Sequence, residues 1–449
     1  MSTVGTVVDL VDHTFFRIER AAEVTNVIQC AWVYDRPVAI DGLRRFHHHL
    51  QRGRLARRIE RSPLPFGRPR WVSPWQQNQL EIAEERCPRA DFDTWLARQA
   101  DTPLDAEHGP GWHLAVVPFS DGGAGVSLVA SHCLTDAVGL CEALADAAQG
   151  RDLPRRWPAA GSRPRPQALR EDVWQTVRDV PAIGKAAAVA AQFAWRNRRD
   201  GGQVATPTGP SARITIPTAT AFVDADQWDS RAGDLGGTSN TLLVAVAARM
   251  AQRMGRTTAD GAVAVTMAVS QRAPGDTRAN AITNVDFTVN PTHAATDLRE
   301  IRTATKQALI RCAEQPEQRW RLLPLVPVIP ERLGRRWVDA AATSAVSVGA
   351  SNVGIIDPAV NRPDGTDADH FAMRSLTAHA TTAMTDRSGG LLSVLSGRVR
   401  GTVFVSVVSY QRDGRNSNSF VNGLVSDVLS EFALSTTTGW PVQERILGR

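Results

Sequence analysis

A strand pattern passes directly into a helix of small residues over 126–148, VSLVASHCLTDAVGLCEALADAA. Alternation along the strand places Leu128, Ala130 and His132 on one face. Asp136 stands at the corner where the chain turns into a helix rich in alanine and leucine. Because a largely apolar strand and a largely apolar helix must both be buried, this corner predicts a mixed α/β (α+β) fold.

The length of the chain, 449 residues, exceeds what a single hydrophobic core usually organises. We predict a first lobe over 1–165, a helical connection over 166–210 and a second lobe over 211–449. A stretch rich in proline and arginine at 150–170 marks the start of the connection between the lobes. Strands and helices are mixed in both lobes without a regular alternation, which favours two α+β lobes.

Apolar spacing and turn residues predict the individual elements. In the first lobe we expect strands at 24–34, 112–119 and 124–132, and helices at 40–61, at 91–100 and from 135 onward. Further along we expect helices around 170–198, from about 226, after Thr238 as a cap, and at 297–313 and 418–433. The expected second-lobe strands lie at 212–217, 262–269, 283–289, 345–352, 371–377, 391–397 and 402–409.

Composition excludes several classes of protein. A hydrophobic fraction of 43% with 22% charged residues is typical of a soluble globular chain. The longest apolar stretch, 182–195, contains Lys185 and is shorter than the ~20 residues needed to cross a bilayer. The N-terminus has no cationic segment before an apolar block, so we expect no secretory signal and a cytoplasmic protein. The pI of about 9.3 comes without a nucleic-acid-binding motif, and no nucleic-acid partner is expected.

Cysteine and histidine usage gives no sign of a metal site. The five cysteines are scattered without paired spacing, which argues against both a disulfide framework and a zinc site. Three consecutive histidines, 47–49, point in different directions on a helix and cannot bind one ion together. We expect them on a surface helix. No metal or other cofactor is predicted.

His132 is a candidate general base. A histidine at the end of a buried strand, followed by a tight corner, can take a proton from an alcohol or amine that attacks a thioester carbonyl. Asp136 would point back into the fold, where a buried carboxylate needs a cationic partner. The pattern itself is short and occurs again at His293 and Asp297, where Asp297 reads as a helix cap. A buried histidine with a purely structural role is the alternative.

A series of longer phrases surrounds this corner in a fixed order, from about residue 9 to 434. The phrases are FFRIER, LARRIERSPLPFGRPRWV, TPLDAEHGPGWHLAVV, GGTSNTLLVAVAARM, MAVSQR, ITNVDFTVNP, GASNVG and VSVVSY. They resemble those of the acyltransferase superfamily that contains chloramphenicol acetyltransferase, peptide-synthetase condensation domains and bacterial wax ester synthase/diacylglycerol acyltransferases. The last branch is the most similar.

The resemblance implies two chloramphenicol-acetyltransferase-like lobes with a tunnel between them. The base of the superfamily is the second histidine of His-His-x-x-x-Asp-Gly, which falls on His132. Its aspartate falls on Asp136 and is structural, paired with an arginine of the second lobe that we assign to Arg272. Ser351 and Asn352 of the GASNVG phrase are candidate oxyanion donors in the tunnel, although such pairs are usually loop residues.

Two departures from the motif point to a divergent substrate. Ser131 stands in place of the first histidine, on the opposite strand face from His132. Ala137 stands in place of the glycine and adds one methyl group where the backbone is tight. The departures keep two alternatives open: a repurposed fold that catalyses cyclisation or dehydration, and a non-catalytic scaffold in a biosynthetic assembly.

The leading hypothesis is an acyltransferase of lipid or secondary metabolism. The acyl group would come from acyl-coenzyme A or from the phosphopantetheine of a carrier protein, and the acceptor would be a hydroxyl or an amine. The thioester is a substrate, so no cofactor is needed. The arginines between Arg44 and Arg70 are candidates to attract a phosphorylated donor, an anionic carrier protein or a lipid surface. A solvated helix face with structural ion pairs is the alternative for these arginines.

Overall fold

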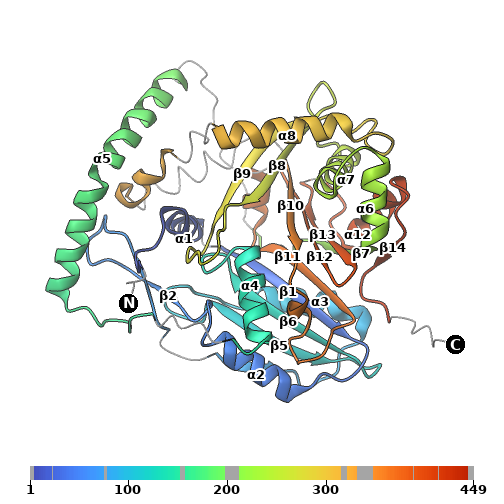
Figure 1. The fold of residues 1–449 in the computed structure, drawn as a ribbon, viewed down its shortest axis with the longest axis horizontal. Helices are drawn as coiled ribbons and strands as arrows, with labels where there is room; N and C mark the ends of the chain where they lie inside the picture. The colour runs from blue at the N-terminus through green and yellow to red at the C-terminus, as the bar shows by residue number, and fades with distance from the viewer. Residues whose placement is uncertain are drawn as a thin grey trace.

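Two β-sheets and the helices around them make up the protein (Figure 1). The computed structural model describes residues 5–22, 24–74, 78–151, 157–197, 212–314, 321–330, 347–387, 389–412 and 414–442. Within these ranges the chain forms a five-stranded sheet, a seven-stranded sheet and one short hairpin. Both sheets are accompanied by helices, so the predicted mixed α/β class with two lobes is confirmed.

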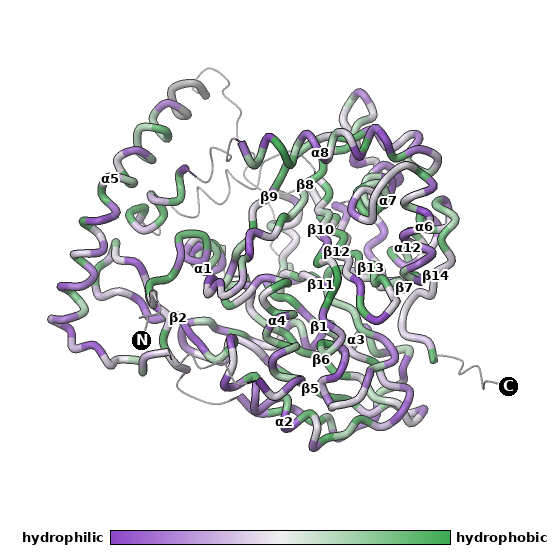
Figure 2. Tube along the Cα trace, in the orientation of Figure 1, coloured by the Kyte–Doolittle hydropathy of each residue, from purple (hydrophilic) through white to green (hydrophobic). Residues whose placement is uncertain are grey.

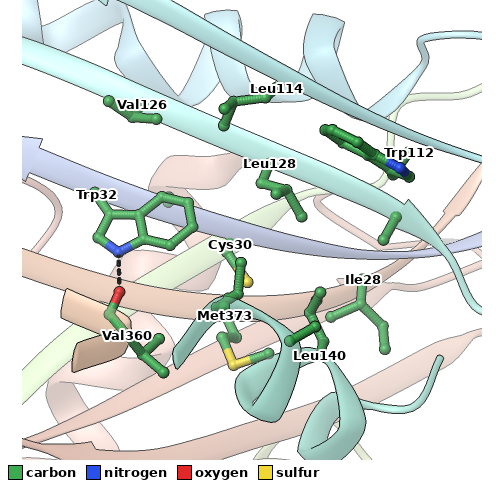
Figure 3. Close-up of a cluster of buried hydrophobic side chains, with 14 of the residues drawn as sticks. Ile28, Cys30, Trp32, Trp112, Leu114, Val126, Leu128, Leu140, Val360 and Met373 are labelled. Atoms are coloured by element: carbon green, nitrogen blue, oxygen red, sulfur yellow. Dashed lines mark hydrogen bonds between the residues drawn. The ribbon is translucent and has the colours of Figure 1, made fainter. Parts of the chain in front are cut away.

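The five-stranded sheet is the centre of the first lobe. Its strand order is β11 (His370–Ala378), β1 (Thr25–Tyr34), β6 (Ala124–Ser131), β5 (Trp112–Pro118) and β4 (Leu80–Ile82). Helices α2 (Ile40–Leu50) and α4 (Ala137–Ala148) pack against each other beside this sheet. Figure 3 shows the core of this lobe, in which Leu128 of β6, Leu140 of α4 and Met373 of β11 are buried together. The Trp32 indole in this core donates to the Val360 carbonyl at 2.8 Å.

The seven-stranded sheet is the centre of the second lobe. Its strand order is β14 (Thr436–Thr438), β7 (Thr218–Asp224), β13 (Thr402–Tyr410), β12 (Leu391–Val399), β10 (Ser347–Ile355), β8 (Val263–Ser270) and β9 (Ile282–Val289). The helices packed with it are α6 (Ala225–Asp234), α7 (Ser239–Arg253), α8 (Arg299–Glu314) and α12 (Asn418–Glu431). Thr238 caps α7 as predicted, since its Oγ1 accepts from the Thr241 amide.

Shorter elements complete the described chain. They are α1 (Leu10–Ala22), β2 (Arg58–Glu60), β3 (Arg70–Val72), η1 (Arg89–Asp91), α3 (Phe92–Ala100), η2 (Leu323–Val328), η3 (Pro358–Asn361) and α11 (Thr382–Arg387). The predicted helical connection contains one long helix, α5 (Arg165–Asn197), which lies along one side of the molecule (Figure 1). Residues 198–210, which end that connection, lie outside the described residues. In the part of the chain that the structure describes, no helix is long and apolar enough to cross a membrane.

One strand of the first sheet comes from the second half of the chain. Strand β11 falls inside the segment 211–449 that the sequence assigned to the second lobe, yet it pairs with β1 as the edge strand of the first sheet. Antiparallel pairing joins Thr25 to Ala378 and Val33 to His370. Local spacing gives the position of a strand but not its partner, so this exchange is invisible in the sequence.

Two local predictions were wrong, and the first helix was missed. The helix expected over 40–61 ends at Leu50, because the chain turns near Gly53 and then enters β2. Leu55 and Ile59 fit helical spacing but are buried in the turn and in the β2–β3 hairpin instead. The strand expected at 212–217 begins at Thr218. Helix α1 was not predicted at all.

Candidate active site

His132 lies immediately after β6, in the turn that leads to α4. Its backbone amide donates to the Asn26 carbonyl of the neighbouring strand at 2.8 Å. The Ser131 hydroxyl accepts from the Cys133 amide at 3.1 Å, and the Ser131 carbonyl accepts from the Leu134 amide at 2.9 Å. These backbone contacts hold the corner in one conformation. They also give Ser131 a structural role at the position where the motif has its first histidine.

Asn280, in the loop before β9, holds the imidazole ring of His132. The ring Nδ1 and Asn280 Oδ1 are 2.8 Å apart. The amide Nδ2 of Asn280 donates to the His132 carbonyl at 2.9 Å and to Asp12 Oδ1 at 3.1 Å. Both of these partners are acceptors, so the amide must present its oxygen to the ring. Nδ1 therefore carries the proton, and Nε2 keeps its lone pair.

Asp12 of α1 anchors the loop that carries Asn280. Its two carboxylate oxygens accept from the amides of Ala279 at 2.9 Å and Asn280 at 2.7 Å, as well as from the Asn280 side chain. Asp12 is fully buried. Burial raises the pKa of Asp12 to about 6, against the lowering effect of the Arg57 charge and of the two backbone hydrogen bonds. A continuous hydrogen-bonded series thus runs from Asp12 through Asn280 to His132.

Two more residues of α1 face the same corner. The ring of Phe15 stacks on the His132 imidazole, with centroids 4.9 Å apart and an interplanar angle of 5°. Glu19 accepts from the Asn26 amide at 2.9 Å and from the Cys133 thiol at 3.2 Å. Burial raises the pKa of Glu19 to about 7 and raises the pKa of Cys133 well above its ordinary value. Cys133 is therefore a buried thiol and not a nucleophile.

The role of α1 was missed from the sequence, although its spacing carried a signal. Asp12, Phe15 and Glu19 are three and four residues apart, which places them on one helix face. Two carboxylates on the buried face of an amphipathic helix indicate polar partners inside the fold. Asn280 left no comparable signal, because nothing in the sequence separates it from other loop asparagines.

Asp136 and Arg272 form a buried ion pair between the two halves of the chain. Arg272 Nη2 lies 2.7 Å from Asp136 Oδ2, and each side chain is only 2% exposed. Asp136 also accepts from the Gly139 amide at 2.7 Å, which caps α4, and from the Ala281 amide at 2.8 Å. Arg272 donates further to the Ala279 carbonyl at 2.9 Å. The pair therefore ties the corner of His132 to the loop of Asn280.

Ala137, which replaces the glycine of the motif, introduces no backbone strain in the turn between β6 and α4. Ala137 is the first residue of α4 and does not adopt a positive φ. A glycine is not required there, since any residue can occupy the first turn of a regular helix. The tight position is Gly139, where an added Cβ would lie 2.8 Å from the Arg272 guanidinium and 2.9 Å from the Thr135 hydroxyl.

The electrostatic environment leaves His132 neutral near physiological pH. Burial lowers the pKa of His132 below 6.5, and the Asp136 charge and the hydrogen bond to Asn280 oppose that effect only in part. A neutral imidazole with its proton on Nδ1 is a base at Nε2. The local geometry can thus accept a proton from a substrate placed beside Nε2.

Ser351 and Asn352 lie on β10 of the second sheet. The Asn352 amide donates to the Asn240 side chain, and its oxygen accepts from the Gly354 amide at 2.8 Å. None of the described contacts joins Ser351 or Asn352 to His132. Their assignment as oxyanion donors stays a prediction.

A cavity of about 400 Å³ lies between α4 and the second lobe. Its α4 side is lined by Val138, Cys141 and Glu142, and its other side by Gly275 and Val353, among others. Val138 is two residues beyond Asp136, so the cavity lies close to the turn that carries His132. A continuous tunnel past the ring of His132 stays a prediction.

The histidine run is less exposed than expected. His47 is buried, with its ring centroid 5.3 Å from that of Trp112. No group of three or more metal-ligating side chains occurs among the residues that the structure describes.

The arginines expected to attract a partner are largely used inside the protein. Arg54 pairs with Glu142 at 2.6 Å, and Arg58 donates to the Glu107 carbonyl at 2.6 Å. Arg57 donates to the carbonyls of Leu134 and Thr277 at 2.6 and 2.8 Å, and burial lowers the pKa of Arg57 to about 9. These side chains join parts of the first lobe near His132 and, through Thr277, connect it to the second lobe.

Comparison with known proteins identifies the fold. No known family model matches the chain, and no curated protein matches it either. The first condensation domain of the calcium-dependent antibiotic synthetase has 15% identity over 96% of this chain and 97% of its own, with a TM-score of 0.58. Trichothecene 15-O-acetyltransferase from Fusarium sporotrichioides has 10% identity over 95% and 94%, with a TM-score of 0.57. Wax ester synthase/diacylglycerol acyltransferase from Marinobacter aquaeolei has 14% identity over 95% and 98%, with a TM-score of 0.56. The chain therefore has the two-lobed fold that condensation domains and these acyltransferases share.

Proposed function

We propose that the protein transfers an acyl group from a thioester to a hydroxyl or amine acceptor, with His132 as the general base. One observation carries the proposal: Asn280 holds the His132 ring in the tautomer whose Nε2 is free to accept a proton. The fold supports the same reaction class, because two of the similar structures are named as acyltransferases and a third is a condensation domain.

The reaction needs one proton carrier. Nε2 of His132 takes the proton of the acceptor as its oxygen or nitrogen attacks the thioester carbonyl carbon, which forms the new C–O or C–N bond. The tetrahedral intermediate collapses, the C–S bond breaks, and Nε2 returns the proton to the departing thiolate. Asn280, Asp12 and the Asp136–Arg272 pair keep the ring in place and do not themselves react. The donor is an acyl thioester of coenzyme A or of the phosphopantetheine of a carrier protein, and the free thiol is the leaving group.

The test is thiol release from a panel of acyl-coenzyme A donors in the presence of pooled alcohols and amines. Release by the natural protein should depend on the acceptor and should fall about 100- to 10,000-fold in His132→Ala. His108→Ala is the matched control, because His108 is an exposed histidine whose side chain is 69% accessible. The same assay with an acylated carrier protein identifies a carrier-bound donor.

Three outcomes would overturn the proposal. Equal release by the natural protein and His132→Ala would remove His132 from the chemistry. A product that keeps the composition of the substrate, or loses one water, would indicate cyclisation or dehydration on the same fold. Binding of carrier protein with no turnover of either donor would indicate a scaffold.

A further inference from the structure

Helix α5 packs on the rest of the protein with one face only. The inner face includes Ala168, Asp172 and Ala186, which are buried. Asp172 accepts from the Ser62 hydroxyl at 2.6 Å and pairs with Arg163 at 3.1 Å and Arg70 at 3.3 Å. The helix is thereby fixed along the side of the molecule, with its opposite face turned outward (Figure 1).

The outward face of α5 carries large apolar side chains. Their exposed fractions are 41% for Leu169, 46% for Val173, 65% for Trp174, 58% for Val177 and 55% for Val180. Spacings of four, four and three residues place four of them in one row, with Trp174 beside it. Single exposed apolar residues are ordinary, but a row of four with an exposed tryptophan beside it on one helix marks an interaction surface.

The adjoining side of the helix carries positive charge, and Arg170 and Arg178 lie four residues before and after Trp174. Arg170, Arg178 and Lys185 are exposed, and none of the three pairs with a described carboxylate. The carboxylates of α5 instead face the body of the protein: Glu171 lies near Arg163 and Arg70, and Asp179 lies near Arg68. Figure 2 shows hydrophobic and hydrophilic residues in turn along this helix. The charged residues of α5 that are classed as exposed are therefore cations, whereas Glu171 and Asp179 are partly buried and paired with arginines of the body.

A hollow of about 690 Å³ adjoins this face. Its lining consists of Val7, Arg70, Arg170, Glu171, Trp174, Gln175 and Arg178. Arg70 is already paired with Glu171 and Asp172, so Arg170 and Arg178, beside the exposed indole of Trp174, are the guanidinium groups that suit an anionic group such as a phosphate next to an apolar layer.

We propose that the outer face of α5 docks on the surface of an anionic phospholipid bilayer. Trp174, Val173 and Val177 enter the boundary between headgroups and acyl chains, and Arg170, Arg178 and Lys185 lie against lipid phosphates. A bilayer suits this helix because the row of Leu169, Val173, Val177 and Val180 has no hydrogen-bonding side chain and the exposed charged residues near Trp174 are cations. This site is separate from the corner of His132 and does not depend on the proposed reaction.

The test is flotation of the complete protein with phosphatidylcholine vesicles that contain about 30% phosphatidylglycerol, compared with pure phosphatidylcholine. Binding should require the anionic lipid and should weaken as salt is raised. Arg170→Gln combined with Arg178→Gln should weaken binding roughly 30-fold, and Trp174→Ala about tenfold. Ile310→Ala and Arg415→Gln are matched controls, since both residues are exposed on other parts of the molecule and should leave binding unchanged.

Each contrary result has a definite meaning. Equal flotation with neutral and anionic vesicles, or binding that the α5 variants leave unchanged, would overturn the proposal. So would a concentration-dependent dimer that Trp174→Ala dissociates, because the face would then bind a second copy of the chain. Since all three substituted side chains are exposed, unfolding midpoints of the variants should match the natural protein and exclude misfolding.

Discussion

Asn280 and His132 bind each other in both directions: the ring donates from Nδ1 to Asn280 Oδ1 at 2.8 Å, and the amide donates back to the His132 carbonyl at 2.9 Å. The two residues lie in different halves of the chain. This reciprocal contact fixes the ring orientation and the tautomer together, so the second half of the protein sets the basicity of a group carried by the first.

Replacing Asn280 should impair the reaction without weakening substrate binding. We expect Asn280→Ala to lower kcat about 10- to 100-fold with little change in KM, because Asn280 acts by positioning the proposed base and not by binding the substrate. The hydrogen bond from Nδ1 to Asn280 raises the pKa of His132, so its loss should also move the acidic limb of the rate profile to lower pH. A purely structural role would lower activity equally at every pH.

The pH at which kcat/KM of the natural protein falls on the acidic side can be predicted. Only the neutral ring of His132 is a base, and burial lowers the pKa of His132 below 6.5. We therefore expect kcat/KM to be level near pH 7 to 8 and to fall only below about pH 6.5. Protonation of Asp12, whose pKa is raised to about 6, should deepen the fall by loosening the loop of Asn280. A limb centred above pH 6.5 would contradict this assignment.

Breaking the Asp136–Arg272 pair should destabilise the fold. Each of Asp136→Ala and Arg272→Ala leaves a buried charge unpaired, and we expect each to lower the free energy of unfolding by about 3–5 kcal/mol. The double variant should cost less than the sum of the two, as measured by urea unfolding. The exposed pair of Asp41 and Arg44 is the comparison, and Asp41→Ala should cost at most about 1 kcal/mol. Additive costs for the buried pair would show that the two residues act independently.

A single methyl group at Gly139 should disturb the same pair. The Cβ of Gly139→Ala would lie 2.8 Å from Arg272 Nη2, so the guanidinium must move away from Asp136. We expect a loss of about 1–3 kcal/mol in the free energy of unfolding. Gly423→Ala is the matched control on α12, where nothing lies within 4 Å of the new Cβ, and it should stabilise by about 0.5–1 kcal/mol. Similar thermal midpoints for the two variants would show that the corner has room to relax.

The ionised carboxylate of Glu19 should lower the free energy of unfolding at high pH. Burial raises the pKa of Glu19 from 4.5 to about 7, so the folded protein holds this proton more tightly than the unfolded chain does. The cost is absent below pH 4.5, grows as the pH rises, and is complete above pH 7. Glu19→Gln should therefore raise the free energy of unfolding by about 3 kcal/mol at pH 8 and by less than about 1 kcal/mol at pH 5. Glu85→Gln, at an exposed position, should show no such dependence. A gain of the same size at both pH values would rule out titration of Glu19 as its source.

Much of the second lobe could be predicted because its elements are locally marked. Thr238 begins α7 as a cap, and the strands around 263–270 and 282–289 follow alternating burial. The corner of His132 was likewise predictable from a strand that ends in a helix. The helix expected over 40–61 failed because apolar residues at helical spacing were buried in a hairpin instead. The spacing of apolar residues indicates which residues are buried, but not whether they lie in a helix, a strand or a turn.

The partners of the candidate base could not be predicted, because they come from distant parts of the chain. Asn280 and Asp12 reach His132 from 148 residues after it and from the first helix, through contacts that exist only once both lobes are formed. The pair of Asp136 and Arg272 was expected only through a family resemblance. Local pattern carries no information on which loop closes over a strand end.

The place of β11 in the first sheet has a consequence for how the protein is made. As the chain leaves the ribosome, β1 emerges early and can pair with β6, but its other edge stays open until residue 370 has been synthesised. During that interval an apolar strand presents unpaired amides and carbonyls, which is the surface that favours misassembly with other nascent chains. Cutting the gene between the lobes would leave that edge open permanently, so neither half would be a self-sufficient folding unit.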